Sequence, residues 1–128
     1  MFFEDQQDSI ESLIAKAADL SNKPFLHSAV KVQGEYDFNS EDIDLIINIL
    51  CRETNGKRLE LYDLELEIYK SNNDLILVVS KLNFPDEPIL WSGPKNLWMN
   101  GQTGKKCNPP NYGFKLENLA SRAKNILV

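Results

Sequence analysis

The feature of this sequence that most constrains its fold is a series of short apolar segments that begins after Lys57. Turn-forming residues separate the segments, which comprise residues 64–68, 75–82, 89–92 and 97–99. Apolar and polar residues alternate in the first segment, whereas apolar residues take both parities in the first half of the second. These patterns predict β-strands, and the second segment should be a central strand because both of its faces are apolar.

The turns between these segments predict how the strands pair. Ser71-Asn72-Asn73-Asp74 indicates a hairpin, because asparagine and aspartate tolerate the backbone conformations of tight turns. Gly93-Pro94 ends the third segment. The apolar parity changes near Tyr62 and Asp63, which predicts a bulge or bend there. Successive strands joined by short turns favour an antiparallel sheet.

An alternating pattern earlier in the chain predicts another strand. Val30, Val32, Tyr36 and Phe38 share one parity, and charged or amide side chains take the other. We expect the first set to face the core and the second to face water. Gly34 takes a core-facing position, which indicates a bulge or a close approach of another backbone.

Three further segments show the apolar spacing of helices. They are residues 9–21, the stretch between Ser40 and Asn55, and residues 116–127. The main apolar stripe of the second segment consists of Ile43, Ile46, Ile47, Leu50 and Cys51. Additional apolar residues widen this stripe beyond what a surface helix needs, so we expect a buried helix at the centre of the core.

These elements predict a single α+β domain across residues 1–128, in the order α-β-α-β-β-β(-β)-α. The sheet should be an antiparallel meander of four to five strands, with about three helices packed mainly on one face. The composition agrees with a globular domain, since 42% of the residues are hydrophobic and 26% are charged. A chain of 128 residues is long enough to bury one core.

The net charge of −5 is unevenly distributed along the chain. Residues 1–94 carry 18 acidic and 8 basic side chains, whereas residues 95–128 carry 6 basic side chains and one acidic side chain. The average acidity disfavours nucleic acid and anionic membranes as partners. The chain lacks a signal-peptide pattern, and its longest apolar run, Leu75–Val79, is too short to span a bilayer. Since Cys51 and Cys107 are the only thiols, we expect a cytoplasmic protein with reduced cysteines.

The segment Trp91–Lys115 differs in composition from the rest of the chain and is the candidate binding site. It holds both tryptophans and four of the six glycines, and it contains no acidic residue. Aromatic, turn-forming and cationic residues together are typical of recognition surfaces. We expect apolar anchors surrounded by a lysine rim that suits an acidic partner surface. The anchors are Trp91, Trp98, Met99 and Tyr112, and the rim consists of Lys95, Lys105 and Lys106.

The motifs for catalysis or cofactor binding are weak. Residues 100–106 approximate a phosphate-binding loop, but they lack its first glycine and the hydroxyl residue that follows its lysine. Glu65 and Glu67 share one face of a strand and are expected to be solvated. His27 is the only histidine, so an enzyme that pairs it with Cys107 would need distant loops to meet. We expect neither a cofactor nor a metal.

The sequence therefore predicts a small non-enzymatic binding or regulatory module that acts through protein contacts of Trp91–Lys115. Three alternatives stay open: single-stranded nucleic-acid binding by the same aromatic and lysine residues, a small enzyme of unknown class, and self-association. Enclosure of both indoles in the core would instead give this segment a structural role.

Overall fold

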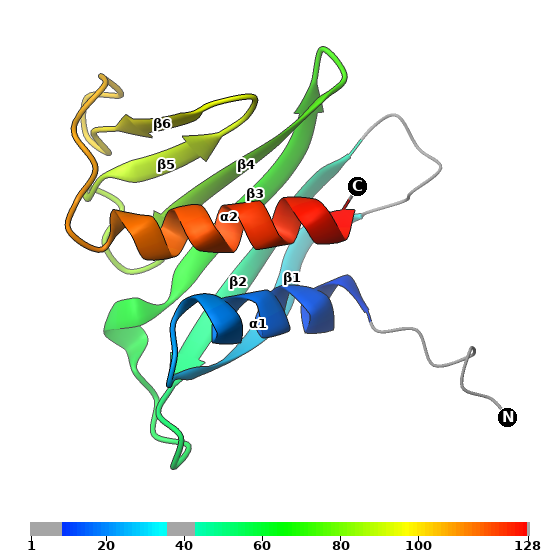
Figure 1. The fold of residues 1–128 in the computed structure, drawn as a ribbon, viewed down its shortest axis with the longest axis vertical. Helices are drawn as coiled ribbons and strands as arrows, with labels where there is room; N and C mark the ends of the chain where they lie inside the picture. Colours follow the sequence, from blue (N-terminus) through cyan, green and yellow to red (C-terminus); the bar gives the residue numbers. More distant parts are fainter. Residues whose placement is uncertain (1–8, 36–42, 128) are drawn as a thin grey trace, which may run out of the picture.

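The computed structural model describes residues 9–35 and 43–127, which form an α+β fold with one antiparallel sheet and two α-helices (Figure 1). The helices are α1 (Ile10–Ser21) and α2 (Gly113–Leu127). The strands are β1 (Leu26–Glu35), β2 (Asp44–Arg52), β3 (Leu64–Ser71), β4 (Asp74–Lys81), β5 (Ile89–Ser92) and β6 (Asn96–Met99). They pair in the order in which they occur in the chain. The predicted antiparallel meander is confirmed, although these residues form six strands and two helices rather than four to five strands and three helices.

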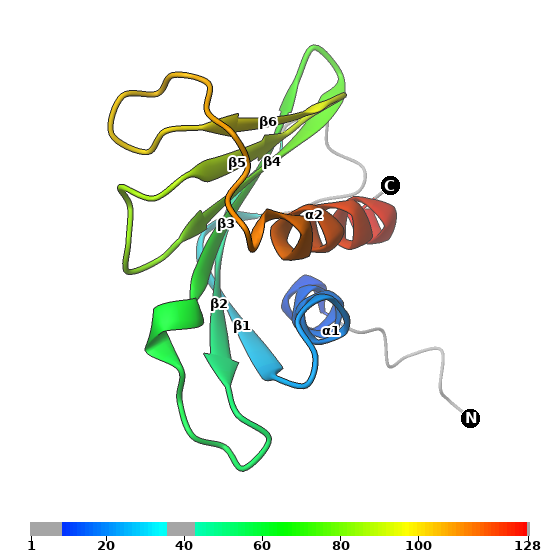
Figure 2. The same ribbon diagram turned by 60° about the vertical axis from the view of Figure 1, so that its left-hand side comes forward.

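Both helices lie on the same face of the sheet, as Figure 2 shows. Buried aliphatic side chains of the helices and the sheet form one core layer between them. Its largest members from the sheet are Leu45, Ile47, Ile49, Leu66, Ile68, Leu77, Leu90 and Val79, and the helices contribute Ile14, Ala17, Leu119, Ala120 and Ala123. Each buried aliphatic side chain of this size is worth about 1.5–3 kcal/mol, so this layer is the main source of stability.

Residues 44–52 form strand β2, so the predicted second helix is wrong. Leu45, Ile47 and Ile49 face the helices and are at most 1% exposed, while the residues between them are less buried. Because β2 lies between β1 and β3, it is apolar on both parities, which produces the same wide apolar pattern as a buried helix. The isoleucines favour the strand, because β-branched side chains pack well on a pleated surface and lose rotamer freedom in a helix.

The residues of β1 that face the core are not the alternate set that the sequence predicted, but the other set. Val30 and Val32 are 50% and 56% exposed, so their assignment to the core is wrong. The other two members of that set, Tyr36 and Phe38, lie outside the described residues. His27 faces the helices instead, because its partner in the β1–β2 register is the buried Cys51. The pairing with β2, which no local pattern reveals, therefore determines which face of β1 is buried.

The prediction of a close backbone approach at Gly34 is confirmed. The register between β1 and β2 shifts between Lys31 and Gln33, which marks a bulge next to this glycine. Gly34 has a φ of +86°, and a Cβ at this position would overlap the carbonyl oxygen of Asp44 in β2. Glycine is required here both by the backbone conformation and by the neighbouring strand.

The predicted bend and hairpin turn are also present. The bend near Tyr62 is the 3-10 turn η2 (Glu60–Tyr62), which connects β2 to β3. The hairpin between β3 and β4 turns at Asn72 and Asn73, whose φ angles are +53° and +68°. Asparagine is among the few residues that adopt such angles at little cost, which is why this turn could be predicted locally.

The buried side chain of Asp63 stabilises the end of the sheet next to η2. It is only 3% exposed. The carboxylate accepts hydrogen bonds from the backbone N–H of Cys51 at 2.8 Å and from the guanidinium of Arg58 at 2.6 and 3.1 Å. A carboxylate is tolerated inside a protein when its charge and lone pairs are matched in this way. The contact ties β2 to the beginning of β3.

The two glycines with the largest positive φ angles provide a test of the β1–β2 approach. Gly56 has a φ of +93° but no heavy atom near the position of a Cβ, whereas Gly34 lies against β2. We expect Gly56→Ala to lower the free energy of unfolding by about 1–2 kcal/mol through backbone strain alone. Gly34→Ala should lower it by about 1–3 kcal/mol more, because the strands must move apart. Urea unfolding of both variants measures the difference, and equal losses would contradict the close approach.

Candidate functional site

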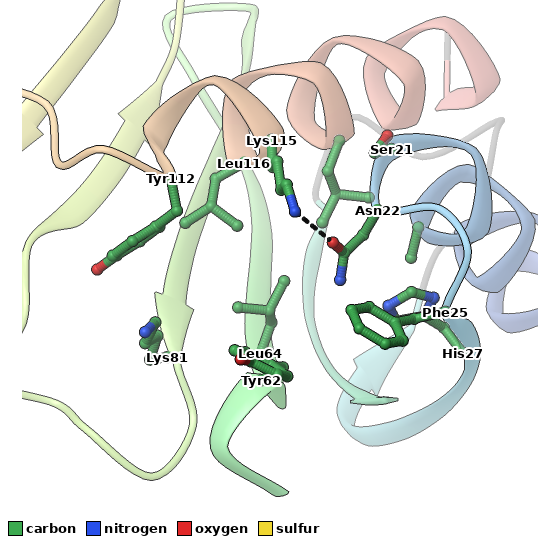
Figure 3. Close-up of a pocket in the computed structure, with 12 residues that line it drawn as sticks. Ser21, Asn22, Phe25, His27, Tyr62, Leu64, Lys81, Tyr112, Lys115 and Leu116 are labelled. Carbon is green, nitrogen blue, oxygen red and sulfur yellow. Dashed lines mark hydrogen bonds between the residues drawn. The ribbon is translucent and has the colours of Figure 1, made fainter. Parts of the chain in front are cut away.

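A pocket lies between the C-terminal end of α1, the N-terminal end of α2 and the adjacent end of the sheet (Figure 3). Its volume is about 170 Å³. Ala18 of α1, Leu64 of β3 and Leu119 of α2 give it aliphatic walls. Phe25 and Tyr62 stack with their ring centroids 5.9 Å apart and form an aromatic wall. Because the walls come from separate elements, the pocket exists only in the folded chain.

Two sequence signals bring the ends of the helices to this pocket. Asn22 and Pro24 end α1, because proline cannot continue a helix and asparagine adopts non-helical conformations readily. Gly113 begins α2 directly against the indole of Trp98, where a Cβ would lie 3.0 Å from the ring. The first turns of α2 then carry Lys115 and Leu116 to the pocket.

The size and lining of the pocket limit what can enter it. An apolar protein cavity of about 150 Å³ admits one molecule the size of benzene. A pocket of about 170 Å³ therefore accommodates one ring or one short branched chain. Its wall of leucine, alanine and aromatic side chains favours an apolar group over a sugar or a peptide backbone.

The polar groups of the pocket are cationic or neutral, since none of the twelve lining residues is Asp or Glu. Lys81 is the first of its two lysines, and its charge is matched. Its Nζ lies 3.4 Å from the carboxylate of Glu87 and 4.3 Å from the ring centroid of Tyr112. The Tyr112 hydroxyl donates to the same carboxylate at 2.9 Å. Burial and this carboxylate raise the pKa of Tyr112, so its hydroxyl stays protonated.

Lys115 is the second lysine, and it lacks an anionic partner within residues 9–35 and 43–127. Its Nζ donates to the neutral side-chain oxygen of Asn22 at 3.1 Å. Lys115 is half-buried and lies in the first turn of α2, which contains no acidic residue. A cation at this end of a helix is disfavoured by about 0.3–1 kcal/mol, because the peptide dipoles point their positive ends there. Helix stability therefore does not account for this lysine.

His27 also lines the pocket, and its side chain links β1 to α1. It is 6% exposed, and its Nδ1 is 3.0 Å from the carboxylate of Asp19. Burial lowers the pKa of His27 and outweighs the opposing effect of Asp19. We conclude that the imidazole is neutral at pH 7 and that its Nδ1–H donates to Asp19. His27 is thus a positioning residue for α1 rather than a third cation of the pocket.

The structure separates the residues of the predicted Trp91–Lys115 site. Trp98 is 5% exposed, packs in the core layer and donates its indole N–H to Glu117 at 2.7 Å. Trp91 lies on the other face of the sheet and donates to the hydroxyl of Tyr69 at 3.1 Å. The two indoles therefore do not share a surface, and Trp98 has a structural role.

The remaining predicted site residues are also dispersed. Tyr112 alone among the seven predicted anchors and rim residues lines the pocket. Met99 is half-buried, and the rim residues Lys95, Lys105 and Lys106 are exposed. No salt bridge involves these three lysines in the part of the chain that the structure describes. Whether they bind a partner stays a prediction.

Sequence reasoning missed most of the pocket. Asn22 follows the last residue of α1, whereas Lys81 belongs to β4 and Lys115 to α2, and no spacing rule relates them. The predicted last helix began at residue 116, so Lys115 was not recognised as a cation in the first turn of a helix, where acidic residues are usual. Such a lysine marks a position of unusual charge, but it does not reveal a pocket.

The cysteines and histidine do not assemble into a reactive site among the described residues. Cys51 is fully buried opposite His27, and burial raises the pKa of its thiol. His27 contacts Asp19 rather than a cysteine. The described residues contain no group of three or more His, Cys, Asp or Glu side chains that could hold a metal ion.

The fold and the pocket define a small α+β domain in which two helices cover one face of a meander sheet. A family model described as a domain of unknown function (DUF8659) matches residues 11–126, and the chain belongs to this family. No curated protein and no solved structure matches the chain. Neither α1 nor α2, the helices of the described residues, is long and apolar enough to cross a membrane.

The state of His27 predicts how stability depends on pH. Because folding lowers its pKa, the unfolded chain binds a proton near pH 6.5 while the folded chain does not. The free energy of unfolding should therefore fall as the pH decreases below 6.5, by at most about 1.4 kcal/mol per pH unit from this residue. The variant His27→Gln should lose this part of the decline. Urea unfolding at pH 7.5, 6.5 and 5.5 tests it, and identical slopes for both proteins would refute the neutral assignment.

Proposed function

We propose that this protein is a non-catalytic binding domain that holds a small molecule in the pocket between α1, α2 and the sheet. The observation that carries this proposal is a preformed space with apolar walls and a few polar side chains converging on it. Such concave, mostly apolar sites with few polar groups are where proteins bind small ligands.

Rigid neighbours support the assignment of this space to a ligand. The stacked rings of Phe25 and Tyr62 form one wall, and Asp63, which follows Tyr62, is fixed by three hydrogen bonds. These hydrogen bonds fix the chain next to Tyr62, which is 49% exposed and whose ring contacts Phe25. A bound molecule would make dispersion contacts with the aliphatic side chains that line the space.

A protein partner for the lysines of Trp91–Lys115 is the second candidate function. The exposure of Lys95, Lys105 and Lys106, together with the absence of salt bridges to them among the described residues, favours an acidic partner. Trp98 is excluded as an anchor in this conformation by its burial.

The free thiols of Cys51 and Cys107 support a cytoplasmic location, where cysteines stay reduced.

A cavity-filling substitution tests the pocket. Leu116→Phe adds a ring to a lining residue, whereas Asn118→Phe adds the same ring to an exposed position of α2. We expect fluorinated fragments of one ring to bind wild type and Asn118→Phe, detected by ¹⁹F NMR, and to shift the amide signals of Ala18 and Leu119. Binding should be lost in Leu116→Phe, whose folding is checked by its unfolding midpoint. Fragment binding that survives in a folded Leu116→Phe protein would place the ligand elsewhere.

A salt titration tests the second candidate. A polyglutamate peptide should bind wild type at low salt, and its affinity should fall as ionic strength rises, because exposed charges are screened. The triple variant Lys95→Gln, Lys105→Gln, Lys106→Gln should bind at least several-fold more weakly. The matched control is the triple variant Lys23→Gln, Lys57→Gln, Lys70→Gln, which removes three exposed lysines elsewhere. Equal losses in both variants would mean that the attraction is nonspecific.

A further inference from the structure

The geometry points to a specific ligand class: a compact apolar molecule with one carboxylate, whose carboxylate binds the ammonium group of Lys115. This inference rests on the proposed small-molecule function and specifies its chemistry. The apolar body would lie against Leu64, Leu116 and Leu119, and the charged end would face the N-terminal turn of α2.

The charges around the pocket single out Lys115. The neighbouring acids are engaged elsewhere, since Asp19 contacts His27 and Glu87 binds Lys81 and Tyr112. Among the described residues, the Lys115 ammonium group donates only to the neutral amide oxygen of Asn22. It lies at the helix end where a positive charge is disfavoured. A bound anion would match the lysine and would also be favoured by the same helix dipole. Among the described residues that line the pocket, Lys115 is the cation that offers a negative charge a partner without a competing carboxylate.

The direction of the side chains agrees with this placement. Figure 3 shows the ammonium group of Lys115 directed toward Asn22, with the amide nitrogen of Asn22 turned toward Phe25. Lysine ammonium groups have three donor hydrogens, and Asn22 takes one of them. A carboxylate beside this pair can therefore accept from a remaining ammonium hydrogen of Lys115 while the existing hydrogen bond to Asn22 stays in place.

The donor set favours a carboxylate over a phosphate. Phosphate sites combine several donors, commonly arginines or a series of backbone N–H groups. Within residues 9–35 and 43–127, this pocket has one lysine without an anionic partner and one side-chain amide, and the carboxylate of Glu87 beside Lys81 would repel a dianion. The volume of about 170 Å³ restricts the apolar part to about one ring.

Two probes of the same shape test the inference. The probes are 4-fluorophenylacetate and 4-fluorophenylacetamide, titrated at pH 7 and followed by ¹⁹F NMR and by the amide signals of the protein. We expect the acid to bind wild type about tenfold more tightly than the amide, as a charge-assisted hydrogen bond predicts. Lys115→Met keeps the aliphatic stem and should bring this ratio close to one. Lys106→Met, which removes an exposed lysine, should leave the ratio unchanged, and Lys115→Arg should retain most of it.

The outcomes separate this inference from the proposed function. Equal binding of acid and amide by wild type, with shifts at Ala18 and Leu119, would overturn the carboxylate class and keep the pocket. A preference for the acid that persists in Lys115→Met would also overturn it. If neither probe bound, and if neutral one-ring fragments also failed to shift these signals, the proposed function itself would fail.

Discussion

The apolar layer between the helices and the central strands is the contact on which the rest of the structure depends. Buried side chains of β2, β3 and β4 meet small residues of the helices, such as Ala17, Ala120 and Ala123, so the two layers approach closely. The pocket lies where α1 stops at Ser21 and beside the first turns of α2, which begins next to Trp98. Its position in the core layer therefore follows from where the two helices end and begin.

The polar contacts around this end of the core share one property, which is that each acid already has a partner. Glu117 accepts from Trp98, Asp19 contacts His27, and Glu87 accepts from Tyr112. These contacts hold α1, α2 and the sheet in position around the pocket. They also leave Lys115 as the cation of the pocket without an anionic partner among the described residues, although the whole chain has a net charge of −5. The local charge at a site can therefore be opposite to that of the protein.

The parts of the fold that could be predicted from the sequence are those specified by local signals. The hairpin at Asn72 and Asn73 and the two terminal helices have turn residues or apolar periodicity of their own. The assignments of β2 and of the buried face of β1 failed, because a central strand and a buried helix share one apolar pattern and because strand register is a nonlocal property. The site was the hardest part to predict. Asn22 and Lys115 are 93 positions apart, and only the packing of α1 against α2 brings them into contact.

The most direct test of this account is a crystal structure of the protein determined under xenon pressure. Xenon occupies dry apolar cavities of this size without requiring any particular functional group. We expect xenon density between Leu64, Leu116 and Leu119, with the side chains of Phe25 and Tyr62 still stacked beside it. A structure in which these side chains fill the space and leave no density for xenon would contradict the existence of a preformed pocket.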